Sequence, residues 1–388
     1  MIARLLNIAT GLAILAAPAV NMVIPLFDQT PLTGVVAPAP RPELTLAGVG
    51  SETFQTAFTK YFEQRYGARP TATRLDNSIA YWLFGEQPPD KMVRIGTNGV
   101  LYLQDQINYY NVRAEPDPAP VAANFKRAQD LLLARGKVLV VMLLPTKTNV
   151  WSEDVPTAWR LEGASPDKLA QTISNPYADA MTRGGVLFVD GRKTVASLPR
   201  DAIYAKTGRH LTAPATCLIV AAAFDVARPF MHEWTVPSLD CAYRMDANVP
   251  LETEDRDLFK LLNVWTPNPK DAVPVTAPTQ ELVPRDQRPS LMVLGSSFGW
   301  KVAREAERTH SVGHILFHYY LSTLVDFDGG PHRPVALRSK EWQDLVASTT
   351  LFLAAVPEEY LVHDNEGFAE AIIATYGATD ASTGAVKH

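Results

Sequence analysis

The hydrophobic pattern of the chain after residue 120 alternates between short apolar runs and amphipathic stretches. The run at residues 138–144 is apolar throughout, which suits a strand buried on both faces of a parallel sheet. Further strands are expected at residues 186–190, 290–295, 314–320 and 351–356. Helices are expected at residues 121–135, 167–183, 212–226 and 299–308, and around Glu341. Strand, helix and strand in repeated succession predict an α/β fold with a mostly parallel sheet and right-handed crossovers.

The stretch from Ser290 to Lys301 consists of an apolar run, a Gly-Ser-Ser-Phe-Gly break and a helix-like continuation. This pattern predicts a buried strand, a sharp turn and a helix, with Ser297 in the turn. Such a turn can hold a serine hydroxyl at the end of a sheet, beside backbone N–H groups that could bind an oxyanion. An ordinary loop rich in turn residues is the alternative. Ligands of α/β sheets bind outside the carboxyl ends of the strands, where Lys147 and Asp190 are also expected.

The region before residue 100 contains two amphipathic helical patterns and one turn signal. One predicted helix carries aromatic side chains at four-residue spacing, namely Phe54, Phe58, Phe62 and Tyr66. A second, at residues 73–83, has three apolar side chains that we expect to face inward, namely Leu75, Ile79 and Trp82. Both apolar faces are interpreted as parts of the hydrophobic core. Asn98-Gly99 between two apolar runs predicts a β-hairpin, because these residues accept the positive φ of a tight turn.

The N-terminal 27 residues are strongly apolar, with no charge between Arg4 and Asp28. A segment of this length can cross a bilayer as a helix, and Arg4 places the short N-terminal side in the cytoplasm. A cleavable signal peptide is the alternative, since Ala17-Pro18-Ala19 approximates a small-residue cleavage site. Both interpretations export the rest of the chain.

The remaining chain divides by composition into a linker, one large domain and a tail. Residues 28–45 are rich in proline and predict an extended linker. Residues 46–380 are expected to form a single domain, in which the Pro-, Asp- and Asn-rich segment 241–288 is interpreted as a surface insertion. Residues 381–388 are expected to be a disordered tail.

Composition narrows the possible partners. The chain has 388 residues, 47% of them hydrophobic and 20% charged, which is typical of globular proteins. The net charge of -5 and the absence of a basic block argue against nucleic acid as the main partner. The two cysteines, Cys217 and Cys241, could form a disulfide in an exported protein or could each be a small buried hydrophobic residue.

A serine nucleophile needs a base, for which histidine is suited because its pKa lies near neutrality. His210 lies in a loop just before a predicted helix that Thr212 would cap, so it is placed to face the functional edge of the sheet. His310, His314 and His318 have a spacing that would suit metal binding on a helix. Their surroundings favour a strand instead, so no metal site is expected.

Six segments carry the features of a known family. They lie at residues 62–69, 83–102, 135–147, 204–212, 295–299 and 356–360. In this order they resemble the alginate O-acetyltransferase family of the AlgJ and AlgX type, exported SGNH-hydrolase-like proteins that O-acetylate bacterial polysaccharides. The resemblance covers most of residues 54–360. It implies a three-layer SGNH-hydrolase-like α/β fold with a circularly permuted motif order, histidine before serine, behind an N-terminal membrane anchor helix.

The resemblance also implies site residues. The family's nucleophile falls on Ser297 and its catalytic histidine on His210, but its aspartate falls on Gly208. Asp190 and Asp201 are the candidates that could replace this carboxylate. Ser296 stands where the family commonly has aspartate or threonine, and Ser296 and Lys147 are the candidate binding residues.

By this resemblance the chain is expected to move acetyl through an acyl-Ser297 intermediate to hydroxyls of an exopolysaccharide. The acetyl group would come from a membrane-bound O-acyltransferase, with no cofactor. The domain would lie in the periplasm, anchored in the inner membrane, or be soluble there after signal cleavage. Because the aspartate is missing, the alternative is a weakly active or inactive homologue that serves as a binding or scaffold subunit of an exopolysaccharide acetylation or export complex.

Overall fold

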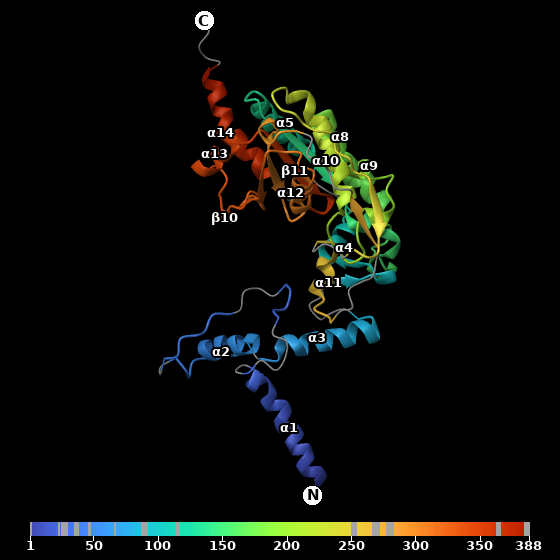
Figure 1. Cartoon of the computed structure of the whole chain (residues 1–388), viewed down its shortest axis with the longest axis vertical. Helices are drawn as coiled ribbons and strands as arrows, with labels where there is room; N and C mark the ends of the chain where they lie inside the picture. Colours follow the sequence, from blue (N-terminus) through green and yellow to red (C-terminus); the bar gives the residue numbers. More distant parts are fainter. Residues whose placement is uncertain are drawn as a thin grey trace. The chain divides into compact units, whose positions relative to one another are not determined.

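The structure is a computed structural model (Figure 1). It describes residues 2–21, 24, 30–34, 39–45, 48–65, 67–86, 92–113, 117–249, 254–265, 272–276, 283–361 and 366–383. Two compact units are present. The N-terminal unit comprises residues 1–95 and 257–269, and the α/β unit comprises residues 96–256 and 270–388. The segment predicted as a single domain, 46–380, is therefore divided between them.

The α/β unit is built on a seven-stranded mixed sheet with strand order β10-β9-β8-β7-β11-β3-β4. The strands are β3 (Val138–Leu144), β4 (Phe188–Asp190), β7 (Ser290–Gly295), β8 (His314–Tyr319), β9 (Thr323–Asp326), β10 (Arg333–Pro334) and β11 (Leu351–Pro357). The five strands from β4 to β8 are parallel, and β9 and β10 join antiparallel at one edge. The mostly parallel α/β sheet expected from the sequence is confirmed.

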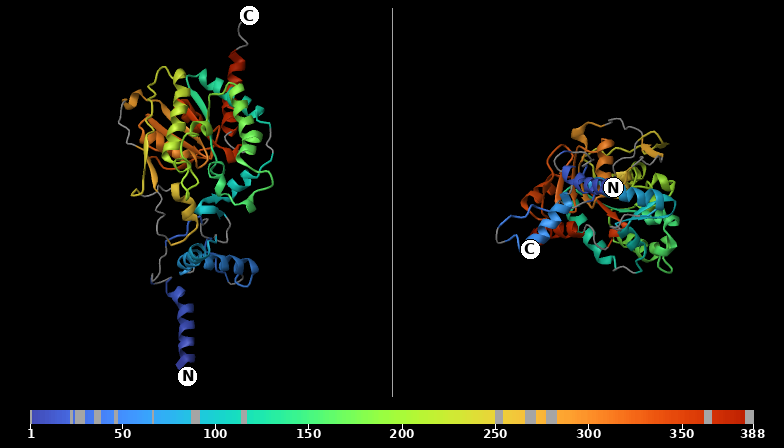
Figure 2. Two further views of the ribbon diagram at one scale, coloured as in Figure 1. Left: turned by 90° about the vertical axis from the view of Figure 1, so that its right-hand side faces the viewer. Right: turned by 90° about the horizontal axis from the view of Figure 1, so that it is seen from below.

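Two groups of helices cover the sheet (Figure 2). α10 (Ala213–Ala227) and α12 (Gly299–Arg308) pack against each other and against strands β3, β4, β7 and β8. α5 (Ala119–Leu133), α8 (Asn175–Arg183) and α14 (Glu366–Thr383) form the second group, in which α5 also packs on β3. Every residue of β3 and β11 is buried, as expected for parallel strands covered on both faces.

The other helices of this unit are short. They are α4 (Gln104–Tyr110), α6 (Lys147–Val150), α7 (Pro166–Leu169), α9 (Gly191–Thr194) and α13 (Lys340–Ser348). α14 reaches Thr383, so the first residues of the predicted tail are helical, and residues 384–388 lie outside the described residues.

The predicted helix at residues 167–183 is continuous but contains a π-helical turn, Ala170–Ser174, between α7 and α8. Pro176 supplies the reason, because its ring displaces the carbonyl four residues earlier and it has no N–H to donate. The Ser174 hydroxyl, at the end of this turn, donates a hydrogen bond to Glu358 Oε1 at 2.5 Å.

α10 begins at the predicted position, but its cap differs from the expectation. Thr212 occupies the N-cap, yet its hydroxyl donates to the carbonyl of Ala202 instead of accepting from the helix. Within the part of the chain that the structure describes, the helical segment Ala213–Phe230 has a length and composition that would suit a membrane span. Half of it is buried within the fold, so we interpret it as a helix of the hydrophobic core.

The insertion 241–288 is not only a set of surface loops, and that prediction was wrong in part. It contains the antiparallel pair β5 (Tyr243–Asp246) and β6 (Val273–Thr276) and the short helical turn Glu254–Arg256. Asp255 in this turn is 5% exposed. The insertion has little hydrophobic periodicity, so its sequence could not predict which of its residues are buried. Residues 250–253, 266–271 and 277–282 lie outside the described residues.

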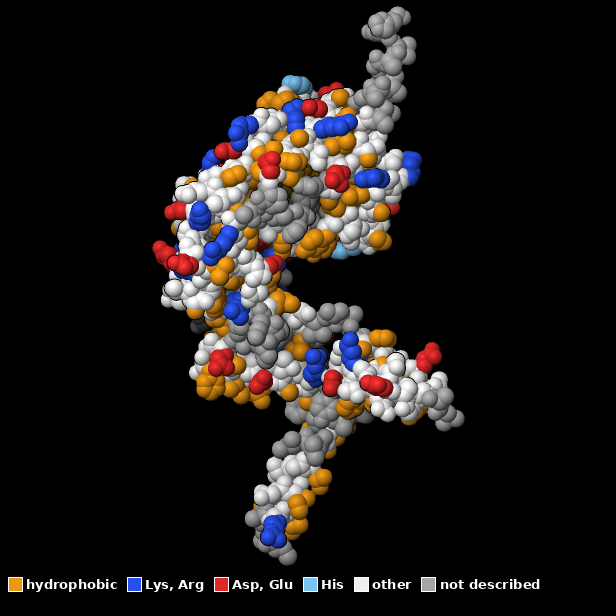
Figure 3. Space-filling view, turned by 180° about the vertical axis from the view of Figure 1, so that it is seen from behind, with side chains coloured by type: hydrophobic (Ala, Val, Ile, Leu, Met, Phe, Trp, Pro, Cys, Tyr) orange, Lys and Arg blue, Asp and Glu red, His pale blue; other side chains and the backbone are white. Residues whose placement is uncertain are grey.

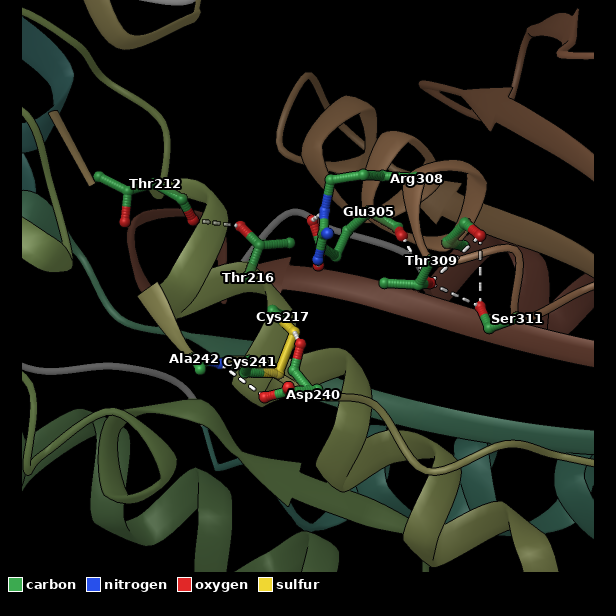
Figure 4. Close-up of a disulfide and its surroundings, with 11 residues drawn as sticks. Thr212, Thr216, Cys217, Asp240, Cys241, Ala242, Glu305, Arg308, Thr309 and Ser311 are labelled. Carbon is green, nitrogen blue, oxygen red and sulfur yellow. Dashed lines mark hydrogen bonds and ion pairs between the residues drawn. A yellow bond between two sulfur atoms is a disulfide. The ribbon is translucent and has the colours of Figure 1, made fainter. Parts of the chain in front are cut away.

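Cys217 and Cys241 form a disulfide in the structure, with their Cα atoms 5.6 Å apart (Figure 4). Cys217 lies on α10, and Cys241 lies at the start of the insertion, beside the turn in which Asp240 accepts from the Ala242 N–H. The disulfide therefore ties the beginning of the insertion to a helix of the core.

The N-terminal unit consists mainly of helices. They are α1 (Ile2–Asn21), α2 (Glu52–Arg65), α3 (Arg69–Ile79) with its π-helical end Ala80–Phe84, and α11 (Asp257–Leu261). β1 (Val93–Ile95) is the last element of the unit's first segment, residues 1–95. The predicted linker at residues 28–45 lies partly outside the described residues.

The predicted burial of both amphipathic faces in this unit was wrong. α2 has no buried residue, and Phe58 and Phe62 are 45% and 43% exposed. On α3 and its π-helical end, Leu75, Ile79 and Trp82 are exposed, whereas Arg74 and Asn77 are buried. Arg74 donates to the carbonyls of Thr30 and Pro31, and Asn77 to that of Leu262, so hydrogen bonds to neighbouring backbone occupy the inner face. Tyr66 lies outside the described residues.

The predicted tight turn at Asn98-Gly99 is present. Both residues have positive φ, 55° and 72°, and the Gly96 N–H donates to the Val100 carbonyl at 2.7 Å. β2 (Leu101–Leu103) follows the turn.

Candidate active site

Ser297 lies in the turn between β7 and α12, as the sequence predicts. The strand ends at Gly295, whose φ of 139° favours glycine, and the helix begins at Gly299. A Cβ atom at Gly299 would lie 2.4 Å from the Phe317 ring, so this position requires glycine in the present packing. The two glycines allow the chain to turn sharply under Ser297, which is half-buried.

His210 lies directly against this serine. Its Nε2 atom is 2.8 Å from Ser297 Oγ, and its ring packs edge-on against Phe298 at 4.9 Å between centroids. The imidazole is 7% exposed. Residues 204–211 form the loop that carries His210, which we call the histidine loop. An antiparallel bridge between Tyr204 and Leu211 joins its two ends. The chain thus brings together two residues that are 87 positions apart.

This pair has the geometry of a serine nucleophile and its base. A neutral imidazole at hydrogen-bond distance can accept the hydroxyl proton as the oxygen attacks a carbonyl carbon. α12 begins at Gly299, two residues after Ser297, so the backbone N–H groups of the turn and the positive end of the helix dipole lie near the serine hydroxyl. The arrangement is suited to acyl transfer.

Gly208 is buried, and the space next to its Cα is occupied by another segment. A Cβ atom there would lie 2.7 Å from the Cα and C atoms of Asp255 and 2.7 Å from the carbonyl oxygen of Glu254. An aspartate cannot stand at position 208 unless that backbone moves. The turn Glu254–Arg256 thus fills the position at which the family's aspartate would begin.

The two carboxylates suggested as replacements lie elsewhere. Asp190 caps α9, and both of its carboxylate oxygens accept from Arg192, at 2.8 and 2.7 Å. Asp201 is exposed in the short helical turn Arg200–Ala202. The structure places neither carboxylate at His210, because an arginine two positions further on already binds one and solvent surrounds the other.

The two candidate binding residues have different surroundings. Lys147 is fully buried, and its Nζ donates to the carbonyls of Lys206 and Gly208 at 2.8 and 2.7 Å. Lys147 therefore stabilises the loop that carries His210 through two hydrogen bonds to its backbone. Ser296 is 1% exposed beside Ser297, and its Oγ has no hydrogen-bond partner among the residues that the structure describes.

A charged cluster next to the dyad formed by Ser297 and His210 was not predicted from the sequence. Arg209 Nη2 lies 3.0 Å from Asp105 Oδ2, which also accepts from the Tyr360 hydroxyl at 2.9 Å. The Arg209 guanidinium lies over the rings of Phe298 and Tyr360. Burial alone would lower the pKa of Arg209, but the Glu359 and Asp105 carboxylates raise it above its ordinary value. The segment Val356-Pro-Glu-Glu-Tyr360 was the available signal, although it gave no indication of its partner.

Glu358 is a fully buried carboxylate at the end of β11. It accepts from the Thr146 N–H at 2.8 Å, the Asn149 amide at 3.1 Å and the Ser174 hydroxyl at 2.5 Å. Burial raises the pKa of Glu358, and these hydrogen bonds and the charge of Arg192 only partly offset that effect. Glu358 joins the ends of β3 and β11 at the edge of the sheet that carries the dyad.

This pKa shift makes stability depend on pH. The folded chain holds the Glu358 proton more tightly than the unfolded chain, so the stabilisation is complete below pH 4.5 and is lost as pH rises through the raised pKa. Relative to wild type, Glu358→Gln is therefore expected to gain stability as pH rises from 4.5 towards neutrality, because the amide cannot ionise. Urea unfolding across this range measures the difference. Asp130→Asn, at an exposed carboxylate, is the control, and a wild-type to Glu358→Gln difference independent of pH would contradict the assignment.

A cavity of about 490 Å³ that is lined in part by Glu358 lies at the ends of β3 and β4. Its polar lining includes Asn149, Asn175, Arg192 and Glu358, and most of its remaining wall is apolar. Ser297 and His210 do not line it. The cavity is thus separate from the dyad.

Among the residues that the structure describes, three side chains together have the composition of a metal site. The ligand atoms of His314, Asp326 and Asp328 lie within 4.8 Å of one another. Asp328 also forms an ion pair with Arg285 at 2.5 Å, and His314 and Asp326 lie on the neighbouring strands β8 and β9. His310 and His318 are not part of this group, in agreement with the strand predicted there.

Comparisons with known proteins agree with this fold. Residues 93–306, more than half of the chain, match a family model described as the SGNH hydrolase-like domain of the acetyltransferase AlgX. No curated protein matches the chain.

The solved structures to which this chain is similar include the following three. The O-acetyltransferase domain of Pseudomonas putida AlgJ is 16% identical, with 70% of this chain and 93% of that one covered and a TM-score of 0.44. Pseudomonas aeruginosa AlgX is 14% identical, with 72% and 65% covered and a TM-score of 0.46. A DHHW family protein from Eubacterium siraeum is 11% identical, with 71% and 92% covered and a TM-score of 0.41.

Proposed function

Because the chain belongs to the AlgX family of SGNH-hydrolase-like acetyltransferase domains, we propose that it transfers acetyl groups through Ser297 to hydroxyls of an exopolysaccharide. The observation that carries this proposal is the 2.8 Å contact between His210 Nε2 and Ser297 Oγ. This contact supports the roles of nucleophile for Ser297 and base for His210, at the C-terminal edge of the sheet.

The reaction has two half-steps with the same groups. In the first, Ser297 Oγ forms a bond to the acetyl carbonyl carbon while His210 takes the hydroxyl proton, and the donor leaves with that proton. In the second, a sugar hydroxyl attacks the acetyl carbon, His210 takes its proton, and the bond to Ser297 Oγ breaks as that oxygen is reprotonated. The N–H groups at the start of α12 stabilise the oxyanion in both.

The donor and the location form part of the same proposal. We propose that a membrane-bound O-acyltransferase delivers acetyl, without a cofactor, to a domain held in the periplasm by α1 in the inner membrane. Exposed leucine and isoleucine side chains along α1 support an anchor, and Figure 3 shows apolar side chains on its surface. The disulfide supports export, since such bonds persist in oxidising compartments. Cleavage of the same segment as a signal peptide is the alternative.

The second candidate function is a binding or scaffold subunit of an exopolysaccharide acetylation or export complex. The observation that favours it is Gly208, because the loss of the triad aspartate costs serine hydrolases on the order of 10⁴-fold in kcat. The buried, tightly packed surroundings of Gly208 and the intact contact between His210 and Ser297 favour the enzyme.

The test is direct detection of the intermediate. The full chain, purified in detergent, is mixed with an activated acetate ester, quenched in acid and digested, and the peptide containing Ser297 is analysed by mass spectrometry. We expect one acetyl group on Ser297, and its disappearance when an acetyl-accepting oligosaccharide is added. Acetylation that spreads over surface lysines and is the same in Ser297→Ala would contradict the proposed enzyme and favour the scaffold.

A further inference from the structure

The short helical turn Glu254–Arg256 of the insertion lies against the histidine loop. It approaches Gly208 so closely that a Cβ there would collide with backbone atoms of Asp255. The carbonyl of Asp255 accepts a hydrogen bond from the Thr207 hydroxyl at 2.8 Å. The insertion is therefore fixed to the loop that carries His210, within three residues of the imidazole.

The side chain of the same residue reaches the other half of the dyad. Asp255 Oδ1 lies 3.0 Å from Lys301 Nζ. Lys301 is the third residue of α12 and lies four residues after Ser297, so it is in the first turn of the helix that follows the nucleophile. Asp255 thus contacts the histidine loop through its backbone and the serine helix through its carboxylate.

The ion pair between Asp255 and Lys301 is buried. Asp255 and Lys301 are 5% and 4% exposed. A buried charge that loses its partner is strongly disfavoured, so neither side chain can leave the pair without cost. A second ion pair, Glu254 with Arg304 at 2.5 Å, joins the same turn to the next part of α12, but Arg304 is 46% exposed. The buried pair is therefore the rigid connection.

We infer that Asp255 is a positioning residue for the Ser297 and His210 pair, supplied by the insertion in place of the aspartate that is absent at position 208. It holds the histidine loop and the start of α12 in fixed register, which maintains the 2.8 Å contact between Nε2 and Oγ. The inference rests on the proposed function. It assigns to the insertion the orienting task that a triad aspartate performs through the histidine ring.

The experiment measures turnover of an activated acetate ester by the full chain, as kcat and KM per folded molecule, with the folded fraction taken from urea unfolding. Asp255→Asn removes the negative charge but keeps the shape and the backbone contact to Thr207. We expect kcat to fall on the order of 10²-fold with KM unchanged, as for a small displacement of reacting groups. The double variant Asp255→Asn/Lys301→Met, which removes both charges of this ion pair, should regain stability but not kcat.

The matched control is Glu254→Gln/Arg304→Gln, which removes the more exposed ion pair of the same turn and should leave kcat within about twofold, as expected for a surface pair. If Asp255→Asn lowers the folded fraction while kcat per folded molecule stays at the wild-type value, the residue is only structural and the inference is wrong. Ser297→Ala distinguishes failure of this inference from failure of the proposed function. If this variant consumes the acetate ester as fast as wild type, the proposed function itself fails, whatever the result at Asp255.

Discussion

Replacing Ser297 or His210 with alanine is expected to lower acetyl transfer on the order of 10⁴-fold or more, and the double variant should be no slower than the slower single variant. The reason is that the two side chains act as one unit. Without the imidazole the hydroxyl loses the base that takes its proton, and without the hydroxyl the imidazole has no nucleophile to activate. The 2.8 Å contact between them leads to strong non-additivity.

The four chains needed are wild type, the two single variants and the double variant, measured with the same acetate ester and oligosaccharide acceptor. Ser296→Ala is the matched control, since it removes a buried neighbouring hydroxyl that has no hydrogen-bond partner among the described residues. It should retain activity within a few-fold. Losses that simply multiply in the double variant would show that Ser297 and His210 act in separate steps, and the proposed mechanism would be wrong.

The second large effect is expected at Gly208. Gly208→Asp should lower the free energy of unfolding by about 3 kcal/mol or more, and it should not increase activity. Its Cβ would lie 2.7 Å from backbone atoms of the segment 254–255, which cannot rotate away as a side chain could. Its carboxylate would also be buried next to Asp255, a group of the same charge. Restoration of the family motif therefore conflicts with the packing of this chain.

Gly208→Ala separates the steric part from the electrostatic part, because it introduces the colliding Cβ without the charge. Gly50→Ala, at a glycine with no atom within 4 Å of the added Cβ, is the control for the general effect of the substitution. Urea unfolding of the full chains gives the three values. A Gly208→Asp variant that is as stable as wild type and faster in acylation would mean that the turn Glu254–Arg256 moves aside and that the inserted segment has no positioning role.

The elements that carry the dyad could be predicted from local patterns. An apolar run that ends at Gly-Ser-Ser-Phe-Gly and continues as a helix defines a strand, a turn and a helix by their own periodicities, and β7 and α12 lie where this pattern indicates. Pairing with His210 depended on the family resemblance, because no local pattern connects two loops that are 87 residues apart.

The contribution of Asp255 could not be predicted in this way. It lies 45 residues after His210 in a segment without hydrophobic periodicity, and its burial results from the path of the insertion across Gly208. Asp190 illustrates the converse. Its position at the end of a strand was predicted correctly, but the end of a strand does not determine which neighbour binds the carboxylate, and Arg192 does so.

The amphipathic helices α2 and α3 show a further limit. Spacing correctly predicted that Phe54, Phe58 and Phe62 share one face, and their rings stack in order along the helix. A periodic pattern gives the chemistry of a face but not what covers it. In the described part of the chain this face remains largely exposed, whereas polar Arg74 and Asn77 are buried on the neighbouring helix.

The close packing at Gly208 has a consequence for comparing family members across genomes. A sequence filter that requires aspartate two positions before the histidine would discard this chain as a degenerate copy, although its serine and histidine are in contact. Because position 208 is a glycine, the acidic inserted segment fills the volume that an aspartate side chain would occupy. The two traits are therefore expected to be gained or lost together during descent, and their joint occurrence would distinguish a rebuilt site from a decaying one.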